Sequence, residues 1–375
     1  MSSSPTPALV ALPGTPIRPD LLSLLATVPD PRDPRGVQHQ LSTILAVGLA
    51  AVLAGARSFV AIGEWVAHQP AHALSDLGVP GPGPGESTIR RVFARLEADS
   101  LDLVLGAYLW TRTSVTDGRR IIALDGKTVR GARTRTKTAP HLVAAYDHAA
   151  GAVLGQVAIT AKSNEIPAVQ GLLALFDLNG AVVTVDAMHT QSDTANLITA
   201  AGGDYVFTVK GNQPTLHAAC KNLPWAKVPA HRISTTGHGR RATRTIKVIQ
   251  APAWVTFAGA TQIAQVRRTV TKAGKRTVEV VYLITSADHH AAPPVTLAAW
   301  VQGHWGIENR LHWVRDVTFD EDRSQVRTGN APQVMATLRN TAISLLRLTG
   351  WDNIAAGLRH HARAPDNPIK LLLTC

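Results

Sequence analysis

The runs Arg119–Gly126 (RRIIALDG) and Ala181–Asp186 (AVVTVD) decide the fold of this chain, because each is a short β-prone stretch that leads into an aspartate. Their apolar residues are continuous rather than alternating, which favours strands covered by helices on both faces of a sheet. The first predicted strand ends at Asp125 and the fourth ends at Asp186. Because site residues collect at strand ends in mixed α/β sheets, these two aspartates are the first candidate site residues.

The elements around these two runs form a recognisable order. In the sequence they are strands 119–124, 141–146 and 152–160, helix 166–176, strand 181–185, helix 192–201 and strand 205–209. This β-β-β-α-β-α-β order places three antiparallel strands before two crossover units. It predicts an α/β fold with a ribonuclease H-like mixed sheet and helices on both faces. The first and fourth strands are neighbours in that topology, so Asp125 and Asp186 are expected to converge.

The sequence before the sheet is helical. Residues 1–19 are rich in Ser and Pro, lack the basic start and apolar run of a signal peptide, and are predicted to be a flexible tail. Apolar helical stretches follow at 21–28, 41–56, 59–68 and 87–110, separated by Pro and Gly breaks. The stretch 41–56 is shorter than the ~20 residues of a membrane span and is rich in Ala and Gly, so a buried helix is expected.

Charge is distributed unevenly along the chain. The 38 Lys plus Arg against 26 Asp plus Glu give a net charge of +12, which points to a polyanionic partner, with nucleic acid as the first candidate. No acidic residue occurs from Tyr205 to Val278, where alternating strands are predicted at 243–249, 262–270 and 277–284. A folded stretch of one sign makes a positive surface, and solvated basic loops are the alternative interpretation. Its basic side chains are Lys210, Lys221, Lys227, Arg232, Arg240, Arg241, Arg244, Lys247, Arg267, Arg268, Lys272, Lys275 and Arg276.

A third candidate carboxylate lies in a helix predicted over 295–314. Glu308 stands mid-helix in the segment WVQGHWGIENRLHWVRD (300–316), among Trp and Leu residues. At 3.6 residues per turn, His304, Glu308 and Arg315 fall near one face, which puts the acid between two basic groups. A second long helix is predicted over 331–348, with Gly350 as its stop signal.

The chemistry of three gathered carboxylates is specific. They would repel one another and raise a pKa unless cations lay between them. Ligation by oxygen alone selects Mg²⁺, with Mn²⁺ as a substitute. Two such ions about 4 Å apart activate a water or a 3′-hydroxyl and stabilise the leaving oxygen of an in-line phosphodiester displacement. The sequence therefore predicts a two-metal site that cuts and joins DNA strands.

Several motifs point to one family. They are LDGKTVRGA around Asp125, KSNEIPAV, VVTVDAMHTQ around Asp186, DYVFTVKGNQPTL, HGRRATR and HWGIENRLHW around Glu308, together with DPRDPRGVQH near Asp30 and STIRRVFARLEA. These motifs resemble DDE transposases of insertion sequences, of the H-repeat-associated type, and the last two resemble the accessory N-terminal domain of that family. The match covers nearly the whole chain after the tail.

The resemblance implies that Asp125, Asp186 and Glu308 are both the catalytic residues and the metal ligands. A Tyr, Arg, Glu and Lys signature of the wider superfamily aligns with Val301, His304, Glu308 and Arg315, and this sequence departs from it at the Tyr and Arg positions.

The implied partner is double-stranded DNA, namely the terminal inverted repeats of the element and the target DNA. A homodimer is expected to pair two DNA ends in the bacterial cytoplasm, at the nucleoid, and no membrane association is expected. The side chains expected to hold DNA phosphates are Lys127, Arg130, Lys210, Arg240, Arg244, His304 and Arg315.

The resulting organisation has five segments. They are the tail at 1–19, a helical N-terminal accessory or DNA-binding domain at 20–115, the first part of the ribonuclease H-like catalytic domain at 116–210, the basic β-rich insertion at 211–290, and the second part of the catalytic domain, with the Glu-bearing helix and C-terminal helices, at 291–375.

Three alternatives remain open from the sequence. A zinc hydrolase would use His304, Glu308 and His312, spaced i, i+4 and i+8 on one helix, but would leave Asp125 and Asp186 unexplained. A catalytically decayed, transposase-derived DNA-binding protein would keep the motifs without activity. A metal-dependent nuclease would cut with the same three acids without joining.

Overall fold

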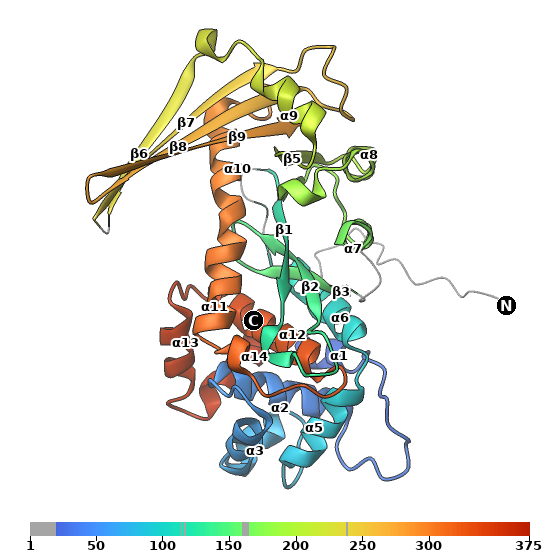
Figure 1. The fold of residues 1–375 in the computed structure, drawn as a ribbon. Helices are drawn as coiled ribbons and strands as arrows, with labels where there is room; N and C mark the ends of the chain where they lie inside the picture. The colour runs from blue at the N-terminus through green and yellow to red at the C-terminus, as the bar shows by residue number, and fades with distance from the viewer. Residues whose placement is uncertain (1–19, 114, 116–117, 160–164, 238) are drawn as a thin grey trace, which may run out of the picture.

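The computed structural model describes residues 20–113, 115, 118–159, 165–237 and 239–375. The predicted tail at 1–19 lies outside the described residues. Figure 1 shows an elongated molecule with helices at one end, a projecting set of strands at the other, and the sheet that joins them between. The strands are β1 Ile121–Thr128, β2 His141–Asp147, β3 Val153–Ile159, β4 Val182–Val185, β5 Asp204–Val209, β6 Ala230–Gly237, β7 Arg240–Gln250, β8 Gln262–Lys272 and β9 Lys275–Thr285.

The sheet has the predicted topology. Its strand order is β3-β2-β1-β4-β5-β9-β8-β7-β6. β1, β2 and β3 pair antiparallel, whereas β4 runs parallel to both β1 and β5. Helices α7 Glu165–Leu173 and α8 Ser192–Ala200 lie in the two crossover connections, as expected. The fold is therefore an α/β fold with a ribonuclease H-like mixed sheet.

The continuous apolar runs of β1 and β4 are buried on both faces. Ile122 and Leu124 pack in a core with Val169 of α7 and Ile198 of α8. Ala123, which points to the opposite face of the strand, packs in a second core with the helices of the two chain ends. Because both faces are covered, neither strand needs a polar face, and this explains why their sequences do not alternate.

The basic β-rich segment extends the same sheet instead of forming a sheet of its own. β9 pairs antiparallel with β5, and β8, β7 and β6 follow in turn. The structure confirms strands in the three predicted regions and adds two elements that the sequence did not predict, β6 and helix α9 Pro214–Lys221. The sequence did not predict β6 because the strand is largely exposed and its apolar residues do not alternate. Ile233 is its one branched apolar residue.

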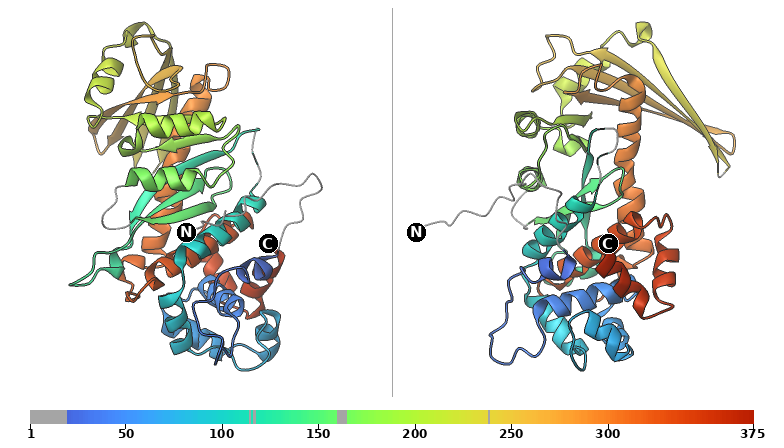
Figure 2. Two further views of the ribbon diagram at one scale, coloured as in Figure 1. Left: turned by 90° about the vertical axis from the view of Figure 1, so that its right-hand side faces the viewer. Right: turned by 180° about the vertical axis from the view of Figure 1, so that it is seen from behind.

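The N-terminal helices are α1 Leu21–Leu25, α2 Leu41–Leu53, α3 Phe59–Ala67, α4 Ala71–Asp76, α5 Glu86–Arg95 and α6 Ala98–Arg112. They share one apolar core with α12 Ala331–Leu348, and α12 has the bounds that the sequence predicted. Helices α13 Ile354–His361 and α14 Asp366–Thr374 complete this end of the molecule (Figure 2). The five-segment division of the chain stays a prediction, since the helices of residues 20–115 pack against the C-terminal part.

Helix α2 is the apolar stretch that could be mistaken for a membrane span. Twelve of its thirteen residues are buried among the other helices. Gly48 is required there, because a Cβ at this position would lie 2.8 Å from the Phe93 ring. Within the described residues, no helix has both the length and the apolarity needed to cross a membrane.

The predicted helical run 87–110 is broken into α5 and α6 at Leu96, where ψ is 139°. No Pro or Gly marks this break in the sequence. A tertiary contact holds it instead, because the Asn330 side-chain amide donates to the Leu96 carbonyl at 2.8 Å and the Asn330 backbone N–H donates to the Ala94 carbonyl at 3.1 Å. A distant loop thus decides where the helix ends.

A buried ion cluster joins the end of the Glu308-bearing helix to α12. Glu321 is 0% exposed and accepts from Arg315 at 2.7 Å and from Arg339 at 3.0 Å. Burial raises the pKa of Glu321, but the charges of Arg315 and Arg339 outweigh it and hold the pKa at about 2. The carboxylate therefore remains ionised in the folded protein at neutral pH.

We predict that Glu321→Gln lowers the free energy of unfolding by about 3–5 kcal/mol, because two buried guanidinium groups are left without their carboxylate. Chemical denaturation at pH 7 measures the decrease. Glu64→Gln, on the exposed face of α3, is the matched control and should change stability little. An equal, small effect of both substitutions would contradict the assignment.

The same cluster predicts a pH dependence. The pKa of Glu321 is lower in the folded protein than its ordinary value of 4.5, so its contribution is complete above that value and is lost as the pH falls towards 2. The fall in stability through that window should therefore be shallower in Glu321→Gln than in the unchanged protein. Chemical denaturation at a series of pH values from about 5 down to about 2 measures this difference.

Candidate active site

Asp125 and Asp186 lie on neighbouring strands of the sheet. Leu124 of β1 is in register with Val185 of β4, and the two aspartates are the next residues along these parallel strands. The Asp125 side chain is mostly buried and accepts a hydrogen bond from the Gly126 N–H at 2.9 Å, whereas the Asp186 side chain is 57% exposed. The structure thus brings the two predicted aspartates to the same edge.

The position of Asp125 differs from the prediction in one respect. β1 does not stop at Asp125 but continues to Thr128, because residues 125–128 remain paired with β2. Only the pairing with β4 ends at Leu124. At Asp125 the pairing with β4 has ended, whereas the pairing with β2 continues. Its side chain therefore lies beside the start of the turn that contains Asp186.

Glu308 reaches the two strands from one long helix. This helix consists of α10 Pro294–Gly306, a π-helical turn Ile307–His312 and α11 Trp313–Val317. The Trp313 N–H donates to the Glu308 carbonyl, five residues back, as a π turn requires. Such turns are frequent at functional sites, and the sequence analysis did not predict this one.

The π turn explains the position of Arg315. A turn closed by bonds to the fifth residue back holds more residues than an α-helical turn, so the residues after it are rotated about the helix axis. Arg315 is therefore turned away from the Glu308 face and is 0% exposed in the Glu321 cluster. The prediction that Arg315 shares a face with Glu308 and holds a DNA phosphate does not fit this burial.

Two histidines of the helix each face one aspartate. His312, four residues after Glu308, has its Nδ1 3.3 Å from Asp125 Oδ2. His304, four residues before Glu308, has its Nε2 3.5 Å from Asp186 Oδ1 and its Nδ1 2.9 Å from the Thr184 hydroxyl. The helix thus contributes an acid flanked by two imidazoles, and the predicted role of His304 beside DNA becomes a contact with Asp186.

The pKa values reflect this crowding. Partial burial, followed by the negative charge of Asp125, raises the pKa of Glu308, although His312 opposes the shift. The hydrogen bond from His304 is the largest cause of a lowered pKa at Asp186, and the charge of Lys210 adds to it. Asp186 also raises the pKa of Glu308, so all three carboxylates interact through their charges.

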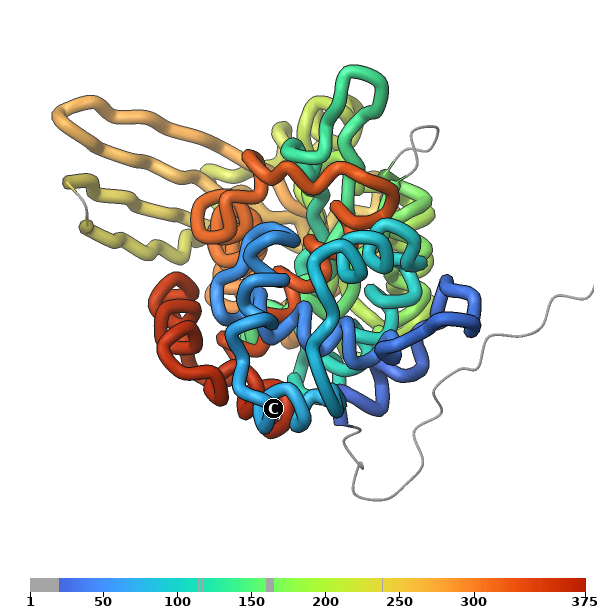
Figure 3. Tube along the Cα trace, turned by 90° about the horizontal axis from the view of Figure 1, so that it is seen from below, coloured from blue at the N-terminus to red at the C-terminus, as the bar shows by residue number. Residues whose placement is uncertain are grey.

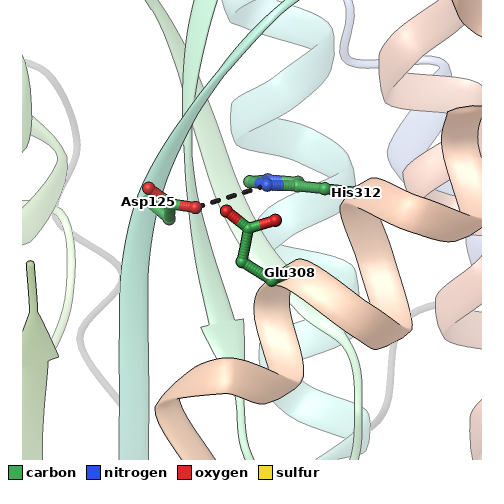
Figure 4. Close-up of side chains that lie close together, drawn as sticks. All are labelled: Asp125, Glu308 and His312. Carbon is green, nitrogen blue, oxygen red and sulfur yellow. Dashed lines mark ion pairs between the residues drawn. The ribbon is translucent and has the colours of Figure 1, made fainter. Parts of the chain in front are cut away.

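The donor set fits a divalent cation. One oxygen each from Asp125 and Glu308 and one nitrogen of His312 lie within 4.8 Å of one another (Figure 4). A carboxylate whose pKa is raised by neighbouring carboxylates, as that of Glu308 is, is stabilised by a positive ion between them. Asp186, which comes directly after the adjacent strand β4, is not part of this group, but its charge acts on Glu308.

A second group of side chains adjoins Asp125 and was missed in the sequence. Glu165, at the start of α7, has one oxygen 2.6 Å from His141 Nε2 and the other 3.1 Å from His189 Nε2. His189 is buried, which lowers its pKa, and the charges of Asp125 and Asp186 act on it. The motifs KSNEIPAV and VVTVDAMHTQ contain Glu165 and His189, but nothing in their spacing indicates that the two meet.

The other predicted DNA-binding residues divide into paired and available groups. Lys127 is mostly buried and its Nζ lies 2.6 Å from Asp316, so its charge is already matched. Arg130 is 75% exposed and only loosely paired with Asp322 at 3.4 Å. Lys210 and Arg240 are exposed, and Arg244 is partly buried beside Trp305.

A cleft of about 110 Å³ opens beside Asp186, between α10 and the strands β7 to β9. Its lining is largely apolar, and its charged side chains are Asp186, Lys210, Arg244, Arg268 and Glu279. The guanidinium of Arg268 lies 5.1 Å from the Trp305 ring centre, a cation–π contact. Asp186 therefore lies in a largely apolar cleft that also contains Lys210, Arg244 and Arg268.

Comparison with known proteins identifies the family of this site. A family model described as "Transposase DDE domain" matches residues 116–345, and a second, described as "DDE_Tnp_1-associated", matches residues 22–109. The chain belongs to the DDE transposases. The kinship predicted from the motifs is confirmed, and the acidic site lies within the matched region.

Relatives of this transposase include two proteins of Escherichia coli. The protein named "Putative transposase YncI" of strain O157:H7 is 34% identical over 87% of this chain and 87% of its own. The protein named "H repeat-associated putative transposase YhhI" of strain K12 is 32% identical over 92% of this chain and 94% of its own. Among solved structures, a piggyBac transposase synaptic complex with hairpin DNA aligns with 95% of this chain and 79% of its own, at 10% identity and a TM-score of 0.44.

The zinc hydrolase alternative does not fit the geometry of this transposase. It requires His304, Glu308 and His312 to converge on one ion. Within the part of the chain that the structure describes, the clustered ligand atoms belong to Asp125, Glu308 and His312, while His304 faces Asp186. The π turn separates the two histidines, and Asp125 takes the place that a second helical histidine would fill.

The crowding predicts an effect on stability. Glu308→Gln should raise the melting temperature of the metal-free transposase, because it removes a carboxylate whose ionised form is disfavoured in the folded state. Millimolar Mg²⁺ should raise the melting temperature of the unchanged protein more than that of the variant, because ligand binding stabilises the folded state by mass action. Differential scanning fluorimetry in EDTA and in Mg²⁺ measures both effects.

Glu64→Gln is the control, since it removes a charge of the same kind on the exposed face of α3. An equal response to Mg²⁺ in Glu308→Gln and in the unchanged protein would show that the ion binds elsewhere.

Proposed function

We propose that this transposase cuts DNA at the terminal inverted repeats of its own element and joins the freed 3′ ends to target DNA. The observation that carries the proposal is the cluster of Asp125 with Glu308, which comes from the helix that follows the basic segment. Asp186 comes directly after β4, the strand paired with β1, and its charge acts on Glu308. Three acids at one edge of a covered sheet have no evident role in folding, because they repel one another. Their arrangement supports phosphodiester chemistry.

Asp125, Asp186 and Glu308 would hold two Mg²⁺ ions, for which Mn²⁺ would substitute. When bound, such ions supply Lewis-acid activation of the attacking oxygen and charge stabilisation of the leaving oxygen. The chain itself orients the acids: the Gly126 N–H fixes Asp125, and His304, held by Thr184, fixes Asp186. Rigid placement of this kind is what positions two reacting oxygens in line.

The proposed DNA interface includes the two hairpins formed by β6 to β9. In the sheet register, Arg240 lies opposite Lys272, which in turn lies opposite Lys275. Directly opposite residues point to the same face, so three cations stand side by side without an acid between them. Arg241 and Arg276, each one residue from this row, are directed to the other face.

Like charges in cross-strand register destabilise a sheet, so this arrangement needs a polyanion to offset it. The two hairpins project sideways from the body of the molecule (Figure 3), and the residues next to the β8–β9 turn are exposed, which leaves them open to a duplex. The β8–β9 turn is tight, with positive φ at Ala273 (47°) and Gly274 (75°), and this stiffens the projection. Backbone phosphates are the partner that this surface fits best.

The cleft beside Asp186 continues this surface towards the acids. Lys210, Arg244 and Arg130 remain in the proposal as phosphate ligands, while Lys127 and Arg315 are engaged by Asp316 and Glu321 and are left out. A homodimer that pairs two DNA ends, acting at the bacterial nucleoid in the cytoplasm, is part of the proposal, since two ends must be joined together. The proposed homodimer is inferred from the reaction, which joins two DNA ends, and not from a protein–protein interface.

We expect Asp125→Asn, Asp186→Asn and Glu308→Gln each to lower Mg²⁺-dependent cleavage and joining at least about a thousandfold, since each removes a ligand that holds the ions, an effect on the order of 4 kcal/mol in the barrier. The assay uses DNA that carries the inverted repeats flanking the gene. Asp193→Asn, an exposed aspartate of α8, is the matched control and should retain full activity.

Full activity in any of the three variants would contradict the assignment of that residue as a catalytic metal ligand. Cleavage without joining by the unchanged protein would favour the nuclease alternative, and binding without cleavage would favour the decayed one.

The hairpins yield a separate prediction. Replacing both Lys272 and Lys275 with Ala should weaken DNA binding and reduce the slope of log K against log salt concentration by about 0.9 for each DNA phosphate that is no longer neutralised. Fluorescence anisotropy over a range of salt concentrations measures the slope. Arg359→Ala, an exposed residue of α13 at the opposite end of the molecule, is the control. An unchanged slope in the double variant would remove the hairpins from the interface.

A further inference from the structure

We propose that His312 is a metal ligand, so that one of the two cation positions of this transposase is formed by two carboxylates and an imidazole, from Asp125, Glu308 and His312. The inference deepens the proposed function, on which it rests for the presence of a bound divalent ion. It also changes the chemistry predicted from the sequence, where ligation by oxygen alone was expected.

The first support is the direction of the His312 side chain. Figure 4 shows its ring directed towards the Asp125 and Glu308 carboxylates, with its Nδ1 3.3 Å from Asp125 Oδ2. One ligand atom from each of the three residues lies within 4.8 Å of the other two. The three atoms come from a strand and from two positions one helical turn apart, so the cluster is built by the fold and not by one flexible loop.

The second support is the burial of His312. Its side chain is only 6% exposed, and its Nε2 is buried without a hydrogen-bond partner among the described residues. A buried imidazole normally has partners for both nitrogens, as His304 has in Thr184 and Asp186. Its Nδ1 faces Asp125, a carboxylate of the acidic site, so this nitrogen is directed into the site.

The third support is the contrast with His304. His304 is the counterpart of His312 on the same helix, four residues before Glu308 rather than four after. Its Nδ1 is engaged by the Thr184 hydroxyl, and it is not among the clustered ligand atoms. The two histidines therefore have different roles: His304 positions Asp186, and His312 donates a nitrogen beside Asp125 and Glu308.

An imidazole changes which ions a site prefers. Oxygen ligands suit Mg²⁺ and Mn²⁺ alike, whereas a nitrogen ligand favours Mn²⁺ and later transition-metal ions over Mg²⁺. The position with His312 should therefore hold Mn²⁺ more tightly than Mg²⁺, and the preference should depend on this one side chain. The cation position that uses Asp186 without His312 should discriminate less between Mn²⁺ and Mg²⁺.

The test uses the full chain without DNA and Mn²⁺ as the probe. Pulsed electron paramagnetic resonance of the Mn²⁺ complex detects coupling to an imidazole nitrogen directly, and ¹⁵N-labelled histidine confirms its source. We expect the coupling in the unchanged protein and in His304→Gln, and its loss in His312→Gln. Titration should show Mn²⁺ binding weakened about tenfold or more in His312→Gln, with a smaller change for Mg²⁺.

Nitrogen coupling that survives in His312→Gln, or that is lost in His304→Gln instead, would overturn the inference, as would its absence from the unchanged protein. Should His312→Gln not fold, as judged by circular dichroism, the labelled protein with His304→Gln, His141→Gln and His189→Gln as separate variants tests the other histidines that face Asp186 and Glu165. Loss of the coupling in any of these three variants would count against His312.

The outcome is independent of the DNA reaction. Nitrogen coupling from His312 in a protein that does not cleave DNA would support the metal site and overturn the proposed function. Cleavage and joining of DNA without any nitrogen coupling would support the proposed function and overturn the His312 metal site.

Discussion

The position of Glu308 depends on the buried ion cluster of Glu321, Arg315 and Arg339. Arg315 lies in the last turn of the helix that carries Glu308, and Arg339 belongs to α12, the central helix of the molecule. α12 is in turn bonded to the sheet, because Asn340 donates to Gln156 of β3 and the Ser344 hydroxyl accepts from the Val153 N–H. These contacts connect Glu308 to the strands that carry Asp125 and Asp186. Because a buried charge without its partner is costly, the cluster holds the Glu308-bearing helix and α12 in one arrangement.

The active site has the opposite character. In the Glu321 cluster opposite charges meet, because one carboxylate binds two guanidinium groups. At the active site, burial and the negative charges of Asp125 and Asp186 raise the pKa of Glu308. A rigid frame in which opposite charges pair can hold a small region in which like charges are close together. That region is where a cation and a phosphodiester would bind. The two histidines of the Glu308 helix moderate the repulsion in the absence of a ligand, each beside one aspartate.

Much of the fold could be predicted from the sequence because its signals are local. The strand runs, the crossover helices and the bounds of α12 follow from apolar patterns and stop signals within each segment. The break at Leu96 could not, because Asn330 makes it from more than two hundred residues away. The same applies to β6, whose exposed and polar sequence becomes a strand only because β7 offers it a partner.

The sequence by itself determined the order of the sheet and the identity of the three acids, since periodicity and motifs are properties of short segments. Tertiary structure alone decided which nearby side chains can act with them. Lys127 and Arg315 look like free cations in the sequence, yet Asp316 and Glu321 match their charges. In the sequence, His312 could be a zinc ligand on the same helix face as Glu308, yet a π turn and the position of β1 place it beside Asp125. The reason is physical: charge pairing and ligand convergence act over a few ångströms in space, and no pattern along the chain records which distant residues come that close.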